Sequence, residues 1–358
     1  MSDSAPAVLQ HKGYTWNWTR FHKWSDRTAP IAPELKLITR HSRVFGMGSC
    51  FADNVVRYLT RDMGVNASSF EESRFYDPVS MLQAVKHLLV EPQYGRDDMW
   101  TTEDGLYANP FRNPRFRAKS YEELDAWSTR IETSAAQKLK AADLIVMTLG
   151  GTESWRNPRT LKTYLTLPFP DVFNAQMPGI AEFHNLSFAE CYAALEEIYL
   201  LLRRHCPEAH IVFTVSPVRL TFTVSEKDVT VATCQGKSTL RAAAGELTDK
   251  YRDHLHYFQS YEIVEYGPAD ANLFGPDGAH VTDLAVALVM NQFAHQFLDA
   301  ELRNSAAFEL TSSMLRKHDF EHLAAVRPVD LRYPIIRLLR TLGLEQAALI
   351  LYQRLRKR

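Results

Sequence analysis

Three short apolar runs constrain the fold of this chain most strongly. They cover residues 44–47, 142–149 and 211–215, and a small polar or glycine residue follows each of them. A fourth, shorter run lies at 256–258. Strands alternating with helices favour a mainly parallel sheet that helices cover on both faces. The segments with the apolar spacing of helices are 78–89, 121–141, 188–204, 238–255 and 282–298.

The sequence predicts three regions. Residues 1–36 form an arm rich in aromatic side chains, which suits either a strand packed on the main body or a platform that stacks on sugars. Residues 37–300 form the α/β domain, with a long loop-like excursion near residues 91–119. Residues 301–358 form a helical extension suited to an oligomer or partner surface, and its basic last five residues fit either a solvated helix end or a contact with an anionic partner.

Composition narrows the possible partners and the compartment. The net charge is −1, so no overall field attracts nucleic acid. No run reaches the roughly 18 apolar residues of a membrane span, and the first residues lack the pattern of a secretory signal. The four cysteines show no metal-binding spacing. We therefore expect a cytoplasmic protein, and nothing in the sequence calls for a metal or an organic cofactor.

Polar clusters fall at the ends of the predicted strands, where ligands bind in doubly wound sheets. Gly48-Ser49-Cys50 follows the first strand, and Gly150-Gly151-Thr152 follows the second. Backbone N–H groups at these positions suit a developing oxyanion, although glycines there also suit a simple tight turn. A third cluster, Asp277 to His280, has a spacing at which the carboxylate can orient the imidazole. His280 is otherwise a helix-capping or buried structural histidine.

Several ordered blocks together resemble the GSCFA family, a branch of the SGNH (GDSL-like) hydrolase superfamily. The first block is the name motif itself, Gly48-Ser49-Cys50-Phe51-Ala52. The resemblance extends over roughly residues 37–300. The further blocks lie at 75–80, at 148–152 with Trp155 after it, and at 216–218, 237–241 and 257–262.

The resemblance implies a flavodoxin-like three-layer α/β/α sandwich with a hydrolase-type crevice. His280 and Asp277 would be the base and its orienting acid. Gly151 and Thr152 would lie at the oxyanion site, where Thr152 replaces the usual asparagine. Ser73 stands where many relatives carry a glycine, and its backbone N–H would still serve the oxyanion or substrate site, to which Trp155 would also belong. Residues 174–177 depart from the expected run, which implies a different substrate.

The nucleophile is either Cys50 or Ser49. An ungapped overlay on a Gly-Asp-Ser motif puts Cys50 at the nucleophile position, where the start of a helix favours a thiolate. A shift of one residue would serve Ser49 equally well. Cys50 is otherwise a small buried apolar residue. The overlay favours the thiol.

These observations predict an acyl-ester hydrolase or acyltransferase that works through a covalent acyl-enzyme. Its substrate would be an O-acylated carbohydrate or a related small ester, by analogy with the superfamily. The alternatives are a non-catalytic module that binds carbohydrate or protein, or a scaffold subunit of a polysaccharide biosynthetic complex.

Overall fold

The structure is a computed structural model. It describes residues 30–70, 73–102, 104–112, 116–165, 181–267 and 272–305, together with residues 308 and 315. The chain divides into two compact units, Met1–Arg316 and Lys317–Arg358. The aromatic positions of the predicted arm, the substrate run at 174–177 and nearly all of the predicted helical extension lie outside the described residues.

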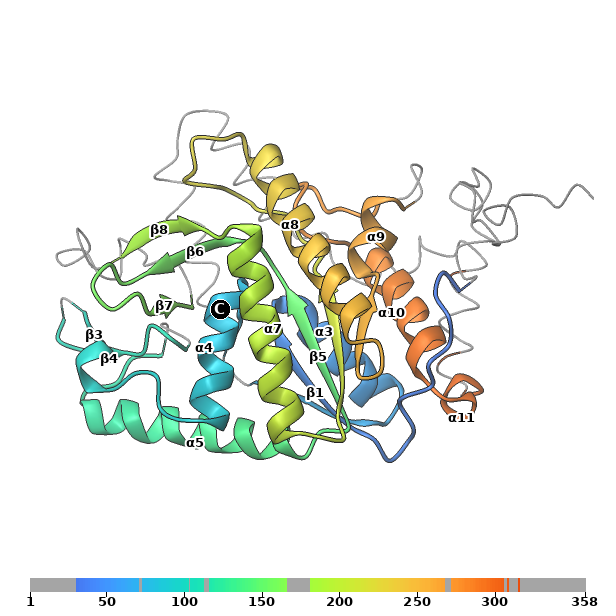
Figure 1. Ribbon diagram of the computed structural model, residues 1–358, viewed down its shortest axis with the longest axis horizontal. Helices are drawn as coiled ribbons and strands as arrows, with labels where there is room; N and C mark the ends of the chain where they lie inside the picture. The colour runs from blue at the N-terminus through green and yellow to red at the C-terminus, as the bar shows by residue number, and fades with distance from the viewer. Residues whose placement is uncertain are drawn as a thin grey trace, which may run out of the picture. The chain divides into compact units, whose positions relative to one another are not determined.

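A five-stranded parallel sheet forms the centre of the first unit (Figure 1). Its spatial order is β10-β9-β5-β1-β2, which is the flavodoxin-like order when the strands are counted along the chain. This confirms the α/β fold class. The strands are β1 (Arg43–Gly48), β2 (Asn66–Ser69), β5 (Leu144–Leu149), β9 (His210–Val215) and β10 (Leu255–Phe258).

Most of the helices begin where the sequence provides a side chain that caps the N-terminus. Asp77 accepts hydrogen bonds from the N–H groups of Val79 and Ser80, and Thr282 caps the last long helix in the same way. The helices are α3 (Cys50–Arg57), α4 (Pro78–Leu89), α5 (Tyr121–Lys140), α7 (Phe188–His205), α8 (Val229–Lys250), α9 (Ser260–Glu265), α10 (Asp283–Phe297) and α11 (Ala300–Arg303). Among the described residues, no helix has the length and apolar character required to cross a membrane.

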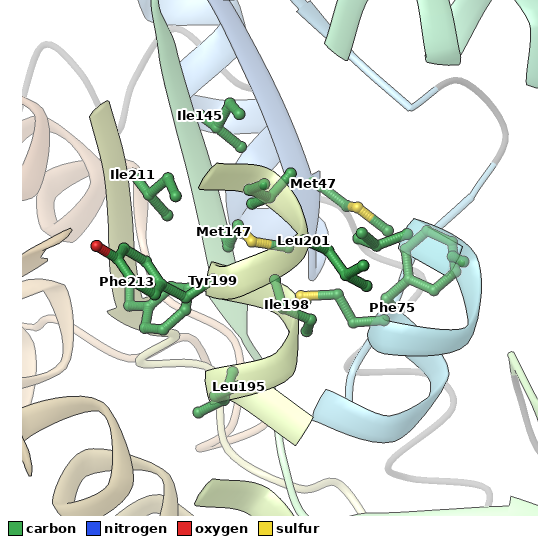
Figure 2. Close-up of a cluster of buried hydrophobic side chains, with 14 of the residues drawn as sticks. Met47, Phe75, Ile145, Met147, Leu195, Ile198, Tyr199, Leu201, Ile211 and Phe213 are labelled. Atoms are coloured by element: carbon green, nitrogen blue, oxygen red, sulfur yellow. The ribbon is translucent and has the colours of Figure 1, made fainter. Parts of the chain in front are cut away.

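Side chains of the central strands alternate between the two faces of the sheet. Met47, Met147 and Phe213 join the buried cluster that Leu195 and Ile198 of α7 complete (Figure 2). On β1 the intervening Gly46 faces α3 instead, since a Cβ atom there would lie 2.9 Å from Val56. Both faces are thus covered, which explains why these strands read as continuous apolar runs.

Two small antiparallel sheets lie outside the main sheet. One pairs β3 (Trp100–Thr101) with β4 (Tyr107–Ala108), inside the segment predicted as a loop-like excursion. The other has the order β7-β6-β8, from Thr163–Tyr164, Glu153–Arg156 and Glu182–Asn185. Aromatic side chains from both sheets pack into one buried cluster with Phe111.

The predicted helix over 238–255 was wrong at both ends. The helix α8 begins at Val229, where Asp228 caps it, and ends at Lys250. A turn follows, and Leu255 already belongs to β10. In the first two turns of α8, residues 229–236, only Ala232 and Gly236 are buried, and the small and β-branched residues there show little apolar periodicity to mark a helix.

Candidate active site

The first polar cluster follows β1 at a very close approach to β5. Gly48 pairs with Thr148 in the parallel register. Its φ angle is 128°, and a Cβ atom at this position would lie 2.2 Å from the Thr148 carbonyl oxygen. Only glycine suits both the dihedral angle and the contact. The close approach brings the residues after β1 next to the residues after β5.

Ser49 is held by hydrogen bonds within the protein. Its backbone N–H donates to Thr148 Oγ1 at 2.7 Å, and its hydroxyl lies 3.0 Å from the same atom. The hydroxyl also accepts from the Phe51 N–H as the N-cap of α3. Only 2% of Ser49 is exposed. Its hydroxyl is therefore occupied in a structural role.

Cys50 is the first residue of α3 and is partly exposed. Burial raises the pKa of its thiol; Arg74 and Lys237 act to lower it, whereas Asp53 adds to the rise. The backbone N–H of Cys50 itself also acts to lower the pKa of the thiol. The net direction is opposite to the expectation of a helix start that favours the thiolate, because partial burial outweighs the neighbouring positive charges.

The glycine pair after β5 packs against the loop before α4. The N–H groups of Gly150 and Gly151 both donate to the Tyr76 carbonyl oxygen, each at 2.8 Å. The expectation of a free oxyanion donor at Gly151 therefore does not hold in this structure. A Cβ atom at Gly150 would lie 3.0 Å from that same oxygen, so glycine is needed there for close approach.

Thr152 offers its backbone rather than its side chain. Its hydroxyl donates to Asn185 Oδ1 at 2.6 Å, which fixes the side chain against β8. Its N–H group has no acceptor among the described residues. The start of α3 likewise leaves the Cys50 N–H without an acceptor within the helix. Among the backbone N–H groups of the predicted oxyanion site, Thr152 and Cys50 thus provide the two that no backbone acceptor of the described residues occupies.

Two other predicted site residues take part in packing. Ser73 is buried, its N–H donates to the Phe70 carbonyl at 3.3 Å, and its hydroxyl has no partner among the described residues. Trp155 lies on β6, where its ring centroid is 5.5 Å from that of Phe183, beside the buried aromatic cluster. No described contact links either side chain to Cys50.

Asp277 and His280 form the predicted pair. The imidazole Nδ1 lies 2.6 Å from one carboxylate oxygen of Asp277, and the other oxygen accepts the N–H groups of Ala279 and His280. Burial acts to raise the pKa of Asp277, but these hydrogen bonds outweigh it and lower the pKa. The side chain of His280 is 61% exposed. No hydrogen bond joins it to Cys50.

Lys237 is a site residue that our reading of the sequence missed. It lies in the middle of α8, is only 2% exposed, and donates through Nζ to the Gly150 carbonyl oxygen. Burial lowers its pKa to about 7, while Cys50 and Glu265 act to raise it. A shallow pocket is lined by Lys237, Gly236 and the residues 150–153. The sequence pattern that could have identified Lys237 is its helical spacing with Leu240, Ala244 and Leu247, which places the lysine on the apolar face of α8.

Among the described residues, no group of three or more histidine, cysteine, aspartate or glutamate side chains is arranged to hold a metal ion. Cys50 is thus a partly buried thiol whose charge interacts with that of the buried Lys237 amine. A covalent reaction at an electrophilic carbon is the chemistry that such groups suit.

Comparison with known proteins identifies a family and distant structural neighbours. The model of the GSCFA family matches residues 43–293. No curated protein matches the sequence.

The solved structures that are similar to this chain include the following three. An acetyl xylan esterase from the rumen bacterium Butyrivibrio proteoclasticus has 11% identity and a TM-score of 0.34, over 79% of this chain and 66% of that one. A salicylyl-acyltransferase from a tetracycline biosynthetic pathway has 13% identity and a TM-score of 0.33, over 72% of this chain and 54% of that one. The third is a carbohydrate esterase family 2 enzyme with a carbohydrate-binding domain, from Corynascus thermopiles (Myceliophthora fergusii). It has 12% identity and a TM-score of 0.29, over 83% of this chain and 69% of that one. The chain spans less than two thirds of the length of the first two.

Proposed function

Because this chain belongs to the GSCFA family, we propose that it is an acyl-ester hydrolase or acyltransferase that works through a covalent acyl-enzyme. The observation that carries this proposal is the contrast between two adjacent residues. Cys50 is partly exposed at the start of α3 beside positive side chains, whereas the Ser49 hydroxyl is buried and hydrogen-bonded to Thr148. Cys50 is therefore the nucleophile in this proposal.

In the acylation step the Cys50 sulfur bonds to the ester carbonyl carbon. The carbonyl oxygen takes the negative charge, and the N–H groups of Cys50 and Thr152 donate to it. When the oxyanion collapses, the bond to the leaving alcohol breaks and a thioester remains. Water or an acceptor alcohol then attacks the thioester and restores the thiol.

His280 is the proton carrier in this scheme. It takes the proton as the thiol reacts and returns it to the leaving alcohol, while Asp277 holds Nδ1 and stabilises the imidazolium. Since no hydrogen bond joins His280 to Cys50 in the free protein, the scheme requires the exposed imidazole to approach the thiol when substrate binds.

For the substrate we propose an O-acylated carbohydrate or a related small ester. The support is the analogy with the SGNH superfamily, to which GSCFA proteins are related. Hydrolysis in the presence and absence of a sugar acceptor distinguishes attack by water from attack by an alcohol.

The test is hydrolysis of p-nitrophenyl acetate and of an acetylated oligosaccharide, with and without an added sugar acceptor. We expect Cys50→Ala and His280→Ala to lower kcat/KM by about 10²–10⁴-fold, and intact mass to reveal an acetylated Cys50. The matched controls Cys234→Ala and His41→Ala should keep full activity, since both residues are exposed outside the site. Wild-type turnover that survives Cys50→Ala would disprove the thiol mechanism. Sugar binding without turnover would favour the binding module instead.

A further inference from the structure

We propose that Lys237 is a positioning residue that makes Cys50 reactive: its buried ammonium group stabilises the Cys50 thiolate and holds the Gly150 loop beside it. The inference rests on the proposed function, because it gives the reactive thiol its electrostatic partner. Arg74 is the other positive neighbour of Cys50.

The side chain of Lys237 reaches the site from deep inside the protein. Before it in α8, Gly236 packs so close to the loop after β5 that a Cβ atom would lie 3.1 Å from Thr152 Oγ1. The Nζ atom then donates to the Gly150 carbonyl oxygen. Gly48 of β1 pairs with Thr148 of β5. Cys50 and Gly150 each lie two residues beyond this pair, just after the two neighbouring strands. The amine of α8 is therefore bonded to a carbonyl just after β5, and the thiol lies just after β1, the strand beside β5.

The hydrogen bonds of Lys237 are incomplete in a way that points to an anion. An ammonium group has three N–H donors. Among the described residues only the Gly150 carbonyl accepts one of them. A buried charged group with unused donors is unfavourable unless an opposite charge compensates it. A thiolate at Cys50, or the negative charge that develops on its substrate, would provide that charge.

The other charged groups near the pair do not replace Lys237. Arg74 is exposed and forms an ion pair with Asp53 at 3.1 Å, so its charge is partly neutralised and screened. Tyr76 is near Cys50, and burial raises its pKa, which keeps the phenol neutral. On the side of Lys237, Glu265 pairs with Arg219 at 2.9 Å. Lys237 is the buried positive charge, and charges interact more strongly when they are removed from water.

The two groups influence each other reciprocally. Lys237 acts to lower the pKa of Cys50, and Cys50 acts to raise the pKa of Lys237. Burial opposes both, since it favours the neutral thiol and the neutral amine. Once the fully protonated pair of thiol and ammonium has lost one proton, it exists either as thiol and amine or as thiolate and ammonium, with the same total charge. This matches the chemistry that the proposed reaction needs, because the charged form is the nucleophile.

The test is the rate of Cys50 alkylation by iodoacetamide as a function of pH, read by peptide mass in the full chain. We expect Lys237→Met to raise the apparent pKa of Cys50 by about one unit, which lowers the labelling rate near neutral pH about tenfold. Lys237→Arg keeps the charge and should label nearly as fast as wild type. Lys227→Met is the matched control, since Lys227 is an exposed lysine before α8, and Cys234 in the same sample is the internal control.

An unchanged Cys50 titration in folded Lys237→Met overturns the proposal. A reciprocal measurement covers the case in which that variant does not fold. In Cys50→Ala, the titration of Lys237, followed by NMR of lysine labelled at the carbon next to Nζ, should shift to lower pH, and no shift overturns the proposal. Alkylation requires no substrate. If the titrations of Cys50 and Lys237 are coupled but the protein cleaves no ester, only the proposed function is wrong. If the protein is an active esterase but its thiol titrates independently of Lys237, only this inference is wrong.

Discussion

The hydroxyl of Ser49 lies 3.0 Å from Thr148 Oγ1, and both residues are buried where β1 and β5 run side by side. This contact ties the end of one strand to the end of the other immediately before α3. It gives Ser49 a structural function, and it leaves the next residue, Cys50, to face the site.

Replacing Ser49 should separate stability from chemistry. We expect Ser49→Ala to lower the free energy of unfolding by about 0.5–2 kcal/mol, because α3 loses its N-cap and Thr148 loses a partner. Cys50 labelling and ester hydrolysis should stay within about threefold of wild type. Urea denaturation and alkylation kinetics measure the two effects. A loss of activity comparable with that of Cys50→Ala would instead identify Ser49 as the nucleophile.

The two glycines after β5 should respond differently to the same substitution. Gly150→Ala places a methyl group 2.9 Å from the Tyr76 ring and 3.0 Å from its carbonyl oxygen. Such overpacking costs about 1–3 kcal/mol and displaces the carbonyl that accepts both glycine N–H groups. Gly151→Ala meets no atom within 4 Å and should change stability by less than about 0.5 kcal/mol. Thermal unfolding compares them, and equal costs would contradict the packing of this loop.

Three histidines at the start of β9 and β10 should make the protein sensitive to acid. His210 Nδ1 lies 3.0 Å from His256 Nε2, and burial together with the neighbouring histidines His210 and His254 lowers the pKa of His256 to about 4. The unfolded chain takes up this proton near pH 6.5. Between these values the unfolded state holds more protons, so the stability present above pH 6.5 is lost as pH falls toward 4.

For His256 alone this loss amounts to about 2–3 kcal/mol. His256→Gln should flatten the decline in unfolding free energy between pH 6.5 and 4, measured by urea denaturation at several pH values. The control His41→Gln removes an exposed histidine and should leave the slope unchanged. If both variants lose stability as steeply as wild type, the decline arises from other groups.

We expect Lys237 to lower the free energy of unfolding at neutral pH. Its pKa falls from 10.5 in the unfolded chain to about 7 in the folded one. The unfolded chain therefore holds more protons between these pH values, and stability rises as pH increases from 7 toward 10.5. We expect Lys237→Met to be more stable than wild type at pH 7 by about 1–3 kcal/mol, and to lose this advantage as pH rises. Urea denaturation of both proteins across this pH range measures the difference in unfolding free energy. If Lys237→Met is less stable than wild type at pH 7, the lysine stabilises the fold and the prediction is wrong.

The sequence contained enough information for most of the main sheet. Buried strands read as unbroken apolar runs, and the residues directly after them are small and polar, so β1, β5 and β9 and their carboxyl ends were predictable. The strand β2 was missed because its residues Asn66–Ser69 are polar or small and carry no apolar run. The helix α9 is too short to show a period.

The site itself depends on contacts that no local pattern encodes. Whether Gly151 offers its N–H depends on the Tyr76 carbonyl, which comes from a distant loop. The choice between Ser49 and Cys50 depends on Thr148 across the sheet. Burial of Lys237 depends on how closely α8 approaches the loop after β5. Each of these is a tertiary contact, and the sequence alone does not distinguish two adjacent residues that differ only in such a contact.

The hydrogen bond from Lys237 to Gly150 also has a consequence for the order of events during synthesis. Cys50 leaves the ribosome early, then β5 with Gly150, and α8 with Lys237 only near the end of the sheet domain. An unfinished chain therefore exposes an ordinary thiol without its positive partner. On the inference above, the Lys237 ammonium can act on Cys50 only after α8 has been synthesised and has packed against the loop that follows β5.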